Sequence, residues 1–438
     1  MQTKPHQKKK INLVSLGCSK NLVDTEDLMG QLQSGRFTIS FEGDSRGCDA
    51  VVINTCGFIN SAKQESIDTI LEHIEAKKRG EIGQVYVMGC LSERYLTDLQ
   101  KEIPDVKKYF GVNSIKEIVE ALGGDYKKEL IGERKLTTPS HYAYLKISEG
   151  CNKKCTFCAI PAIRGRHASK PKALILTETR RLVAKGTKEI MLIAQDLTYY
   201  GTDLFKKNSF ADLLLSLSDI DKVEWIRLHY VYPAGFPTEI LPIIRDNPKI
   251  CNYIDIPIQH INSRMLGLMQ RGHTREGTID LLHKIRETIP GVALRTTLIV
   301  GFPGETDEEF NELLQFVRDF KFDRLGVFAY SHEEGTTAYK LPDNVPEKIK
   351  QQRLGEIMNA QQSVSLELNQ QKVGKVFKTI IDREENGYYV GRTESDSPEV
   401  DNEVLIESPG SDIQIGQFYP VRILRADFFD LFGTISQK

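Results

Sequence analysis

Residues 142–158 read YAYLKISEGCNKKCTFC, a strand-like run that ends in three closely spaced cysteines. Cys151, Cys155 and Cys158 form a C-x3-C-x2-C set, and three such thiolates can hold three irons of a [4Fe–4S] cluster while the fourth iron stays open. An open iron suits S-adenosylmethionine (SAM), which chelates metal before its C–S bond is reduced. Structural zinc normally takes four closed ligands, commonly as C-x2-C pairs, and no second pair lies nearby. The motif therefore favours an iron–sulfur cluster over zinc.

Strand-like and helix-like segments continue to alternate after this motif, as far as about Asp323. Together with the first strand, five later segments would give six strands with helices between them. This alternation predicts a barrel or partial (β/α) barrel whose chemistry lies in the loops at the strand ends. The five segments are EIMLIAQD (189–196), EWIRLHY (224–230), NYIDIPIQ (252–259), VALRTTLIVG (292–301) and RLGVFAYS (324–331).

Before the motif, the first ~130 residues repeat one pattern three times: a short apolar run ends in a cysteine and a helix-like stretch follows. The runs INLVSLGC, AVVINTC and QVYVMGC end at Cys18, Cys56 and Cys90. Alternating strands and helices predict a parallel, doubly wound sheet, and the carboxyl ends of its strands share one edge, where ligands bind. The three cysteines are therefore expected to converge. The alternative is a chance placement at three strand ends.

The helix-like stretches carry apolar residues at helical spacing. After Cys18 we expect one apolar face, and after Cys56 another. The expected members are Leu22, Met29 and Leu32 in the first helix, and Ile67, Ile70, Leu71 and Ile74 in the second.

The end of the chain has a different character. Residues from about 342 to 371 are charged and helix-like, and the remainder consists of short alternating strands with Gly, Asp and Asn turns. This pattern predicts a small antiparallel β-barrel of about 70 residues. The expected domains are an N-terminal cluster-binding domain over 9–127, a barrel domain over 137–367 and a terminal β-barrel over 370–438.

Composition limits the class of protein. The chain has 438 residues, a formal net charge of −2 and eight cysteines. The start, MQTKPHQKKK, is basic, but the apolar run after it is short, so we expect neither a signal peptide nor a membrane anchor. In a cytoplasm that keeps thiols reduced, this many cysteines indicate metal binding or catalysis. Cys48 and Cys251 are expected to be buried apolar residues instead.

With these motifs in view, the chain resembles the radical-SAM methylthiotransferase family along nearly its whole length, including a terminal barrel like the TRAM module. The strings that carry the resemblance are SLGCSKNLVDTE, NTCGFINSAKQES, GCLSERY, IPAIRGRHASKP, DIPIQHINSRML and GFPGET. Within the family they are similar to the branch that modifies ribosomal protein S-twelve. The resemblance implies that Cys18, Cys56 and Cys90 bind a second [4Fe–4S] cluster, beside the SAM-cleaving cluster at Cys151, Cys155 and Cys158.

The resemblance also implies a reaction. The second cluster would hold sulfur from a sulfide or persulfide source, and SAM would serve both as methyl donor and as radical source, with electrons from an external donor. The product would carry a methylthio group on the β-carbon of an aspartate of ribosomal protein S-twelve. The other main branch of the family modifies tRNA adenosine.

Four residues are weaker candidates for the SAM pocket. Gln195 and Asp196 end one strand and are as compatible with a helix N-cap. Ile299 and Gly301 precede the GFPGE turn, which glycine torsions explain equally well.

Other charged residues remain open. Arg164, Arg166 and His167 follow the cysteine loop, where a cation can grip a carboxylate, although an ordinary solvated face is the more frequent explanation. His229 either points into the barrel or packs.

Charge bears on the substrate class. Residues 371–438 hold 8 Lys and Arg against 12 Asp and Glu, a net charge of −4. RNA binding rests on basic residues, whereas an acidic module suits a basic protein partner, so no strong nucleic-acid binding is expected. Two other interpretations stay open: a non-catalytic iron–sulfur electron carrier, and an RNA-binding module with structural zinc.

Overall fold

The computed structural model describes residues 8–436 except 34, 36 and 408–411. The first seven residues of the basic start and the last two residues of the expected terminal barrel lie outside the described residues. The chain forms two compact units. The first unit comprises Met1–Thr138, Glu149–Asn152 and Ala159–Arg181, and the second comprises Pro139–Ser148, Lys153–Cys158 and Leu182–Lys438.

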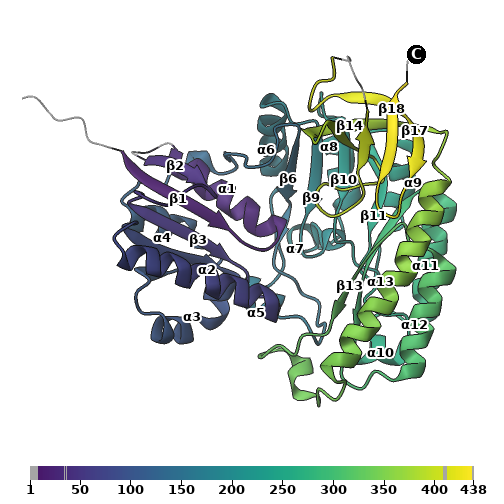
Figure 1. Ribbon diagram of the computed structural model, residues 1–438, viewed down its shortest axis with the longest axis horizontal. Coiled ribbons are helices and arrows are strands. Elements are labelled where there is room, and N and C mark those ends of the chain that lie inside the picture. Colours follow the sequence, from purple (N-terminus) through teal and green to yellow (C-terminus); the bar gives the residue numbers. More distant parts are fainter. Residues whose placement is uncertain (1–7, 34, 36, 408–411, 437–438) are drawn as a thin grey trace, which may run out of the picture. The chain divides into compact units, whose positions relative to one another are not determined.

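The first unit is built on a five-stranded parallel sheet (purple and blue in Figure 1) with the strand order β2-β1-β3-β4-β5. This doubly wound order confirms the expected fold and places a topological switch point between β1 and β3. The sequence pattern missed β2 and β5. The strands are β1 (Lys9–Ser15), β2 (Phe37–Phe41), β3 (Ala50–Thr55), β4 (Gln84–Gly89) and β5 (Lys108–Tyr109), and the helices are α1 (Ser19–Gln33), α2 (Asn60–Lys78), α3 (Cys90–Glu102) and α4 (Ile115–Leu122).

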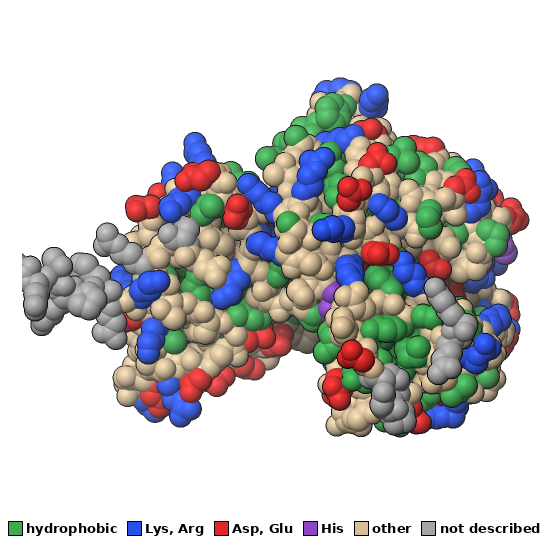
Figure 2. Space-filling view, turned by 90° about the horizontal axis from the view of Figure 1, so that it is seen from above, with side chains coloured by type: hydrophobic (Ala, Val, Ile, Leu, Met, Phe, Trp, Pro, Cys, Tyr) green, Lys and Arg blue, Asp and Glu red, His purple; other side chains and the backbone are tan. Residues whose placement is uncertain are grey.

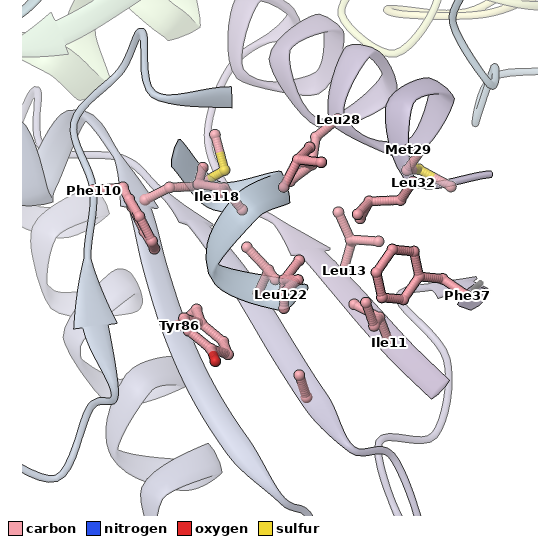
Figure 3. Close-up of a cluster of buried hydrophobic side chains, with 14 residues drawn as sticks. Ile11, Leu13, Leu28, Met29, Leu32, Phe37, Tyr86, Phe110, Ile118 and Leu122 are labelled. Carbon is pink, nitrogen blue, oxygen red and sulfur yellow. The ribbon is translucent and has the colours of Figure 1, made fainter. Parts of the chain in front are cut away.

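Apolar side chains cover both faces of this sheet. On one face, residues of β1 pack with Leu28, Met29 and Leu32 of α1 and with residues of α4, as Figure 3 shows. On the other face, Ile70 and Ile74 of α2 pack against β3, β4 and α3. Burying both faces explains why these strands read as continuous apolar runs rather than as alternating ones. Leu71 was expected on the buried face of α2, but it is exposed, because the helix buries only a narrow stripe.

The second unit contains a six-stranded sheet with the order β13-β12-β11-β10-β9-β6, in which every neighbouring pair is parallel. All six expected strands are confirmed, and the sheet is open, as in a partial barrel. Helix α13 lies along β13 and α12 (Figure 1). The strands are β6 (Tyr142–Lys146), β9 (Glu189–Ile193), β10 (Trp225–Leu228), β11 (Ile250–Asp255), β12 (Ala293–Val300) and β13 (Arg324–Ala329).

The helices of this region are of very different lengths, and the longest, α13, covers the segment that was expected to be helical before the terminal strands. Their bounds are α7 (Thr202–Phe205), α8 (Phe210–Ser218), α9 (Ile240–Asp246), α10 (Ser263–Leu268), α11 (Arg275–Thr288), α12 (Asp307–Phe320) and α13 (Glu347–Gln370), with 3-10 turns η2 (Leu197–Tyr199) and η3 (Thr337–Lys340). A further 3-10 turn, η1 (Lys128–Leu130), belongs to the first unit. Around the cysteine loop lie β7 (Ser148–Glu149), α5 (Ile160–Arg164), β8 (Ala168–Ser169) and α6 (Lys172–Ala184).

The chain ends in a closed five-stranded barrel with the order β14-β15-β16-β18-β17. The small terminal barrel is confirmed, but it is not wholly antiparallel, because β16 pairs with β18 in parallel. Closing the sheet removes the free edges at which another chain could pair. The strands are β14 (Val376–Glu385), β15 (Tyr388–Thr393), β16 (Val404–Ile406), β17 (Phe418–Ala426) and β18 (Leu431–Ile435).

Buried ion pairs join the terminal barrel to the six-stranded sheet within the second unit. The loop after β15 brings Asp396 to Arg324, with an Nε–Oδ1 distance of 2.9 Å, and Asp401 to Arg295 at 3.3 Å. Arg392 of β15 donates to Glu189 of β9 at 2.8 Å. These carboxylates therefore face the sheet rather than solvent. Among the described helices, none has the length and apolar character needed to cross a membrane.

Candidate functional site

The three N-terminal cysteines lie at the carboxyl ends of three adjacent strands. Ser15 of β1 is in register with Asn54 of β3, and Thr55 of β3 is in register with Gly89 of β4. Cys56 and Cys90 directly follow their strands, and Cys18 follows β1 by three residues. The sheet therefore brings the trio to one edge, beside the switch point where such folds bind ligands.

Helix N-termini surround this edge. Helix α1 begins one residue after Cys18, α3 begins at Cys90, and α2 begins four residues after Cys56. The first N–H groups of a helix have no partner within the helix, and the helix dipole makes this end favourable for negative charge. The helix ends therefore suit a bound anion such as sulfide.

The three cysteines of the trio differ in their exposure to solvent. Cys18 is exposed, Cys56 is half-buried and Cys90 is buried. Burial raises the pKa of Cys56, and the neighbouring Cys18 raises it further. Burial likewise raises the pKa of Cys90 to about 12, so this thiol is neutral near pH 7 until a metal displaces its proton. Among the described residues, no three His, Cys, Asp or Glu side chains lie close enough together to hold a single metal ion.

The donor chemistry nevertheless fits an iron–sulfur cluster. Three thiols at one sheet edge are the ligand type that such clusters use. The backbone also comes very close there: Gly17 has φ of +91°, and a Cβ on this glycine would lie 2.7 Å from the Cβ of Cys56. Glycine is required at this position by both its torsion and its contact.

A buried polar network lies directly behind Cys90. Asn21 of α1 donates from Nδ2 to the main-chain oxygens of Leu16, at 2.9 Å, and Thr55, at 3.1 Å, and so ties the ends of β1 and β3 together. The Cys90 thiol lies 3.6 Å from Asn21 Oδ1, which also accepts a 2.6 Å hydrogen bond from Arg164 Nη2. The same guanidinium contacts Asp24 Oδ2 at 3.1 Å.

Cys151, Cys155 and Cys158 are called the loop set below. The first of them, Cys151, belongs to the same unit as the trio. Its N–H donates to the carbonyl of Gly165 at 3.1 Å, and the Asn152 side chain accepts from the N–H of His167 at 3.1 Å. Gly150 has φ of +71°, and a Cβ there would lie 2.2 Å from the carbonyl oxygen of Arg166. The chain before Cys151 and the chain after Arg164 are therefore in close contact.

Cys155 and Cys158 belong to the second unit, where the turn between them is held on three sides. The N–H of Cys158 donates to the carbonyl of Cys155 at 3.1 Å. Thr156 donates from its N–H to Met269 and from its hydroxyl to Leu268, while its carbonyl accepts from Ala338. The segment after α10 and the η3 turn thus fix the loop.

Two cations and a tyrosine surround Cys155. Arg271 Nη1 lies 3.2 Å from Cys155 Sγ, and the Tyr232 hydroxyl lies 3.6 Å from the same sulfur. Lys153 Nζ and the Arg271 guanidinium lie 4.1 Å and 4.3 Å from the centre of the Tyr232 ring. Positive and aromatic groups of this kind can stabilise the negative charge of an iron–sulfur cluster.

Of the residues proposed for the SAM pocket, Asp196 and Gly301 have clear structural roles. Asp196 caps the η2 turn by accepting from the N–H of Thr198 at 2.9 Å, and its second oxygen lies 3.4 Å from Lys153. Gly301 adopts φ of +72° and donates its N–H to Glu305 at 2.6 Å. Both structural alternatives are therefore present, and neither prevents an additional contact with a ligand.

The other two candidates for the SAM pocket, Ile299 and Gln195, lie on or just after strands of the six-stranded sheet. Ile299 is on β12 and packs with Phe302 and Tyr330, and Gln195 is a half-buried residue just beyond the end of β9. Cys48 and Cys251 are buried, as expected.

The remaining charged candidates from the sequence differ in burial and in their partners. Of the two interpretations left open for Arg164, the grip on a carboxylate holds and the solvated face does not, because only 4% of the residue is exposed and its charge is paired with Asp24 and Glu149. Arg166 is exposed. His167 is buried and bonded to Ser169, and His229 packs against Ser397 of the terminal barrel at 3.0 Å.

Three contributors were missed from the sequence: Asn21, Tyr232 and Arg271. Asn21 is buried on α1 together with Asp24, Thr25 and Glu26, and the apolar face expected for this helix includes none of these polar residues. Tyr232 and Arg271 lie beyond strand and helix ends far from Cys155 in sequence, so no local pattern marks them.

Comparison with known families gives three matches along the chain. Residues 10–111 match the model described as Uncharacterized protein family UPF0004, residues 145–317 match the Radical SAM superfamily, and residues 373–435 match the TRAM domain.

Curated relatives match over almost the full length. The chain is 54% identical over 433 residues to the ribosomal protein uS12 methylthiotransferase RimO of Christiangramia forsetii, covering 99% of this chain and 96% of that protein. It is 52% identical to the RimO proteins of Cytophaga hutchinsonii, covering 99% and 100%, and of Bacteroides thetaiotaomicron, covering 99% of each.

A solved structure supports the fold. The radical SAM methyltransferase TsrM of Kitasatospora setae, with cobalamin and a [4Fe–4S] cluster bound, has a TM-score of 0.56 and 15% identity, covering 93% of this chain and 84% of that chain. At this identity the likeness concerns the fold alone.

Proposed function

Because the chain belongs to the RimO family of radical-SAM methylthiotransferases, we propose that it adds a methylthio group to ribosomal protein uS12. The observation that carries the target is identity of 52–54% to RimO proteins over nearly the whole of both chains. A Radical SAM match over residues 145–317 and a TRAM match over 373–435 support the same assignment. The modified atom is proposed to be the β-carbon of an aspartate of uS12.

The proposed metal ligands are the two sets of three cysteines. Cys151, Cys155 and Cys158 would hold the SAM-cleaving [4Fe–4S] cluster, and the trio at the edge of the five-stranded sheet would hold a second cluster. When bound, these groups would supply the electron that cleaves SAM and a place for the sulfur that is transferred. Each thiol must lose its proton to bind iron, so cluster loading depends on pH.

The chain's own residues orient and protect these sites. Arg271 and Tyr232 present hydrogen-bonding groups to Cys155 Sγ. Thr156 anchors the loop through three hydrogen bonds, so the cysteines on either side of it are held against α10 and η3. Such fixed polar groups stabilise charge without having to reorganise during the reaction.

Four residues near the ends of β9 and β12 are proposed to contact SAM. Gln195 and Asp196 follow β9, while Ile299 and Gly301 lie at the end of β12. Because these two strands belong to one parallel sheet, their carboxyl ends lie on the same edge. Asp196 is already oriented by Lys153 and by its cap of η2, which makes it a suitable acceptor for the SAM amino group or ribose.

The partner is proposed to be a basic protein rather than RNA. Residues 371–438 carry a net charge of −4. Asp396 and Asp401 of this segment are paired with arginines of the sheet, so the charge offered to a partner comes from the other acidic residues. On the face shown in Figure 2, Lys and Arg side chains are mixed with Asp and Glu among the described residues, without a broad patch of positive charge. A site for RNA would need such a patch. We place the reaction in the cytoplasm, with an external electron donor and a sulfide or persulfide source.

An anaerobic assay tests the proposal. The reconstituted enzyme receives SAM, a reductant and sulfide, and uS12 and tRNA are offered in parallel. We expect mass spectrometry to show a methylthio mass gain on an aspartate of uS12 and none on tRNA. The same preparation without sulfide serves as the control. Gain on tRNA adenosine would overturn the substrate, and SAM cleavage without either product would contradict both branches.

A further inference from the structure

We propose that Arg164 is a positioning residue that holds Cys151 and the N-terminal cysteine trio in one fixed frame. Its side chain reaches the trio, while the residue after it, Gly165, binds the backbone of Cys151. The consequence for catalysis, that SAM cleavage remains coupled to methylthio transfer, rests on the proposed function. The structural part can be tested without it.

The guanidinium of Arg164 is directed at the edge of the five-stranded sheet. Nη2 donates to Asn21 Oδ1 at 2.6 Å and to Asp24 Oδ2 at 3.1 Å. Asn21 in turn bridges the ends of β1 and β3 and lies 3.6 Å from the sulfur of Cys90. The side chain is therefore one hydrogen bond removed from a proposed cluster ligand.

The other nitrogen of the same side chain faces the segment that leads into the cysteine loop. Nη1 donates to both carboxylate oxygens of Glu149, at 3.1 and 3.0 Å, and Glu149 lies two residues before Cys151. The carbonyl of Gly165 accepts from the N–H of Cys151 at 3.1 Å. Arg164 and Gly165 thus hold this end of the loop by side chain and by backbone.

Packing adds a third link. Ala159, the residue directly after Cys158, lies with Ile163 in a buried apolar cluster that contains Cys90 and Val112. The short segment from Ala159 to Ile163 therefore packs beside the buried member of the trio.

Only arginine suits this position. Its planar fork can serve Asn21 and Asp24 from one nitrogen and Glu149 from the other, whereas the ammonium of lysine is a compact point charge. Lysine would retain the charge and lose the simultaneous contact with both segments. Arg164→Lys therefore separates the positioning role from the presence of a cation.

The first test measures coupling. Arg164→Lys and wild-type enzyme, matched for iron and sulfide content, are given SAM and uS12, and the 5′-deoxyadenosine released per methylthiolated uS12 is counted. We expect the ratio to rise about tenfold or more, since misplacing reacting groups by about 1 Å can cost on the order of 10²-fold in rate. Arg181→Lys is the matched control, because Arg181 lies on the same segment but pairs with Glu133 at 3.6 Å, and its ratio should stay at the wild-type value.

The second test needs no activity. Amide hydrogen exchange of the full-length enzyme is followed in peptides that cover residues 149–153. The Cys151 N–H is bonded to Gly165, so its exchange should accelerate in Arg164→Lys and not in Arg181→Lys. If Arg164→Lys loses its clusters, Asp24→Asn, which keeps the guanidinium and weakens one contact, takes its place and should show smaller changes of the same kind.

The outcomes are distinct. An unchanged ratio together with unchanged exchange in cluster-loaded Arg164→Lys would overturn the inference, as would loss of clusters in Arg164→Lys and Asp24→Asn alike, which would indicate a purely structural role. If wild-type enzyme gives no methylthiolated uS12, the proposed function fails, and exchange at 149–153 still decides whether Arg164 positions Cys151.

Discussion

Cys151, Cys155 and Cys158 lie within eight consecutive residues, whereas Cys18, Cys56 and Cys90 are spread over 73 residues of the chain. Chain connectivity alone keeps the first set together. The second set meets only because β1, β3 and β4 are adjacent and parallel, with registers that bring their ends to one edge. The difference implies that the trio is sensitive to the packing of the first unit, while the loop set is sensitive to its immediate contacts.

Loss of one cysteine of the C-x3-C-x2-C motif should have the strongest effect on activity. Cys155→Ala should abolish SAM cleavage, because two thiolates do not hold the cluster with its open iron. The measurement is 5′-deoxyadenosine by chromatography under reducing, anaerobic conditions. Iron analysis should show the N-terminal cluster retained. Wild-type release of 5′-deoxyadenosine from this variant would contradict the assignment of Cys155.

The matching change in the trio should separate the two activities. Cys56→Ala is expected to stop formation of methylthiolated uS12 and to spare some uncoupled SAM cleavage, because the loop set is untouched. Both products are measured in one reaction, with Cys48→Ala as the control, since Cys48 is a buried cysteine outside both sets. Methylthiolation by Cys56→Ala at the normal rate would show that the second-cluster proposal is wrong.

A substitution distant from both sets of cysteines should lower stability and leave the coupling of SAM cleavage to product unchanged. Asp396→Ala leaves Arg324 buried without its carboxylate and should lower the free energy of unfolding by about 3–5 kcal/mol. Denaturant unfolding measures this loss. For the protein that remains folded, the ratio of SAM cleavage to product should equal that of wild type, and a changed ratio would show that this ion pair reaches the catalytic sites.

A substitution at the sheet edge should harm the trio selectively. Gly17→Ala places a methyl group 2.7 Å from the Cβ of Cys56 at φ of +91°, at an expected cost of about 1–3 kcal/mol. We expect loss of iron from the N-terminal site and retention of SAM cleavage. Gly150→Ala is the counterpart in the loop set, because its Cβ would lie 2.2 Å from the carbonyl of Arg166, and it should impair SAM cleavage instead. Identical phenotypes for the two variants would contradict the separation of the sites.

A small loss of stability is expected in mild acid, through protonation of His229 in the unfolded chain. Burial lowers the pKa of His229 despite the nearby Asp255, so the folded protein holds this imidazole neutral while the unfolded chain takes up a proton below its ordinary pKa of 6.5. Stability should therefore decline as pH falls below about 6.5. His229→Gln, which can keep the hydrogen bond to Ser397, should show a shallower decline in Tm between pH 7 and pH 5.5. An equal decline in both proteins would exclude His229 as a source of acid sensitivity.

Much of the fold follows from the sequence, because apolar runs of strand length alternate with helix-like stretches. All six strands of the six-stranded sheet and the three strands that precede the trio were predicted. The three strands before the trio read as continuous apolar runs because both faces of their sheet are covered. Strand β5 was missed because two residues give no periodic pattern. The parallel pairing of β16 with β18 is decided by closure of the barrel.

Part of the candidate site could likewise be predicted from the sequence, and part could not. The C-x3-C-x2-C motif can be recognised in the sequence because its geometry is local, and the cysteines at three strand ends can be expected to converge because parallel strands share an edge. The sequence left open whether Arg164 faces solvent or binds a carboxylate, because a charged residue after a loop gives no sign of the carboxylates that it will meet. Its partners Asn21, Asp24 and Glu149 come from separate parts of the chain.

By itself, the sequence determined the types of secondary structure, the two sets of cysteines and the chemistry that their thiols favour, since these depend on local spacing and on the identity of the side chains. Which charges are buried and which residues support each cysteine depends on how the elements pack in the folded chain. Arg271 reaches Cys155 from 116 residues away, and Arg164 reaches Asn21 from 143 residues away. Contacts over such separations depend on how whole elements pack, and no short pattern in the chain encodes them.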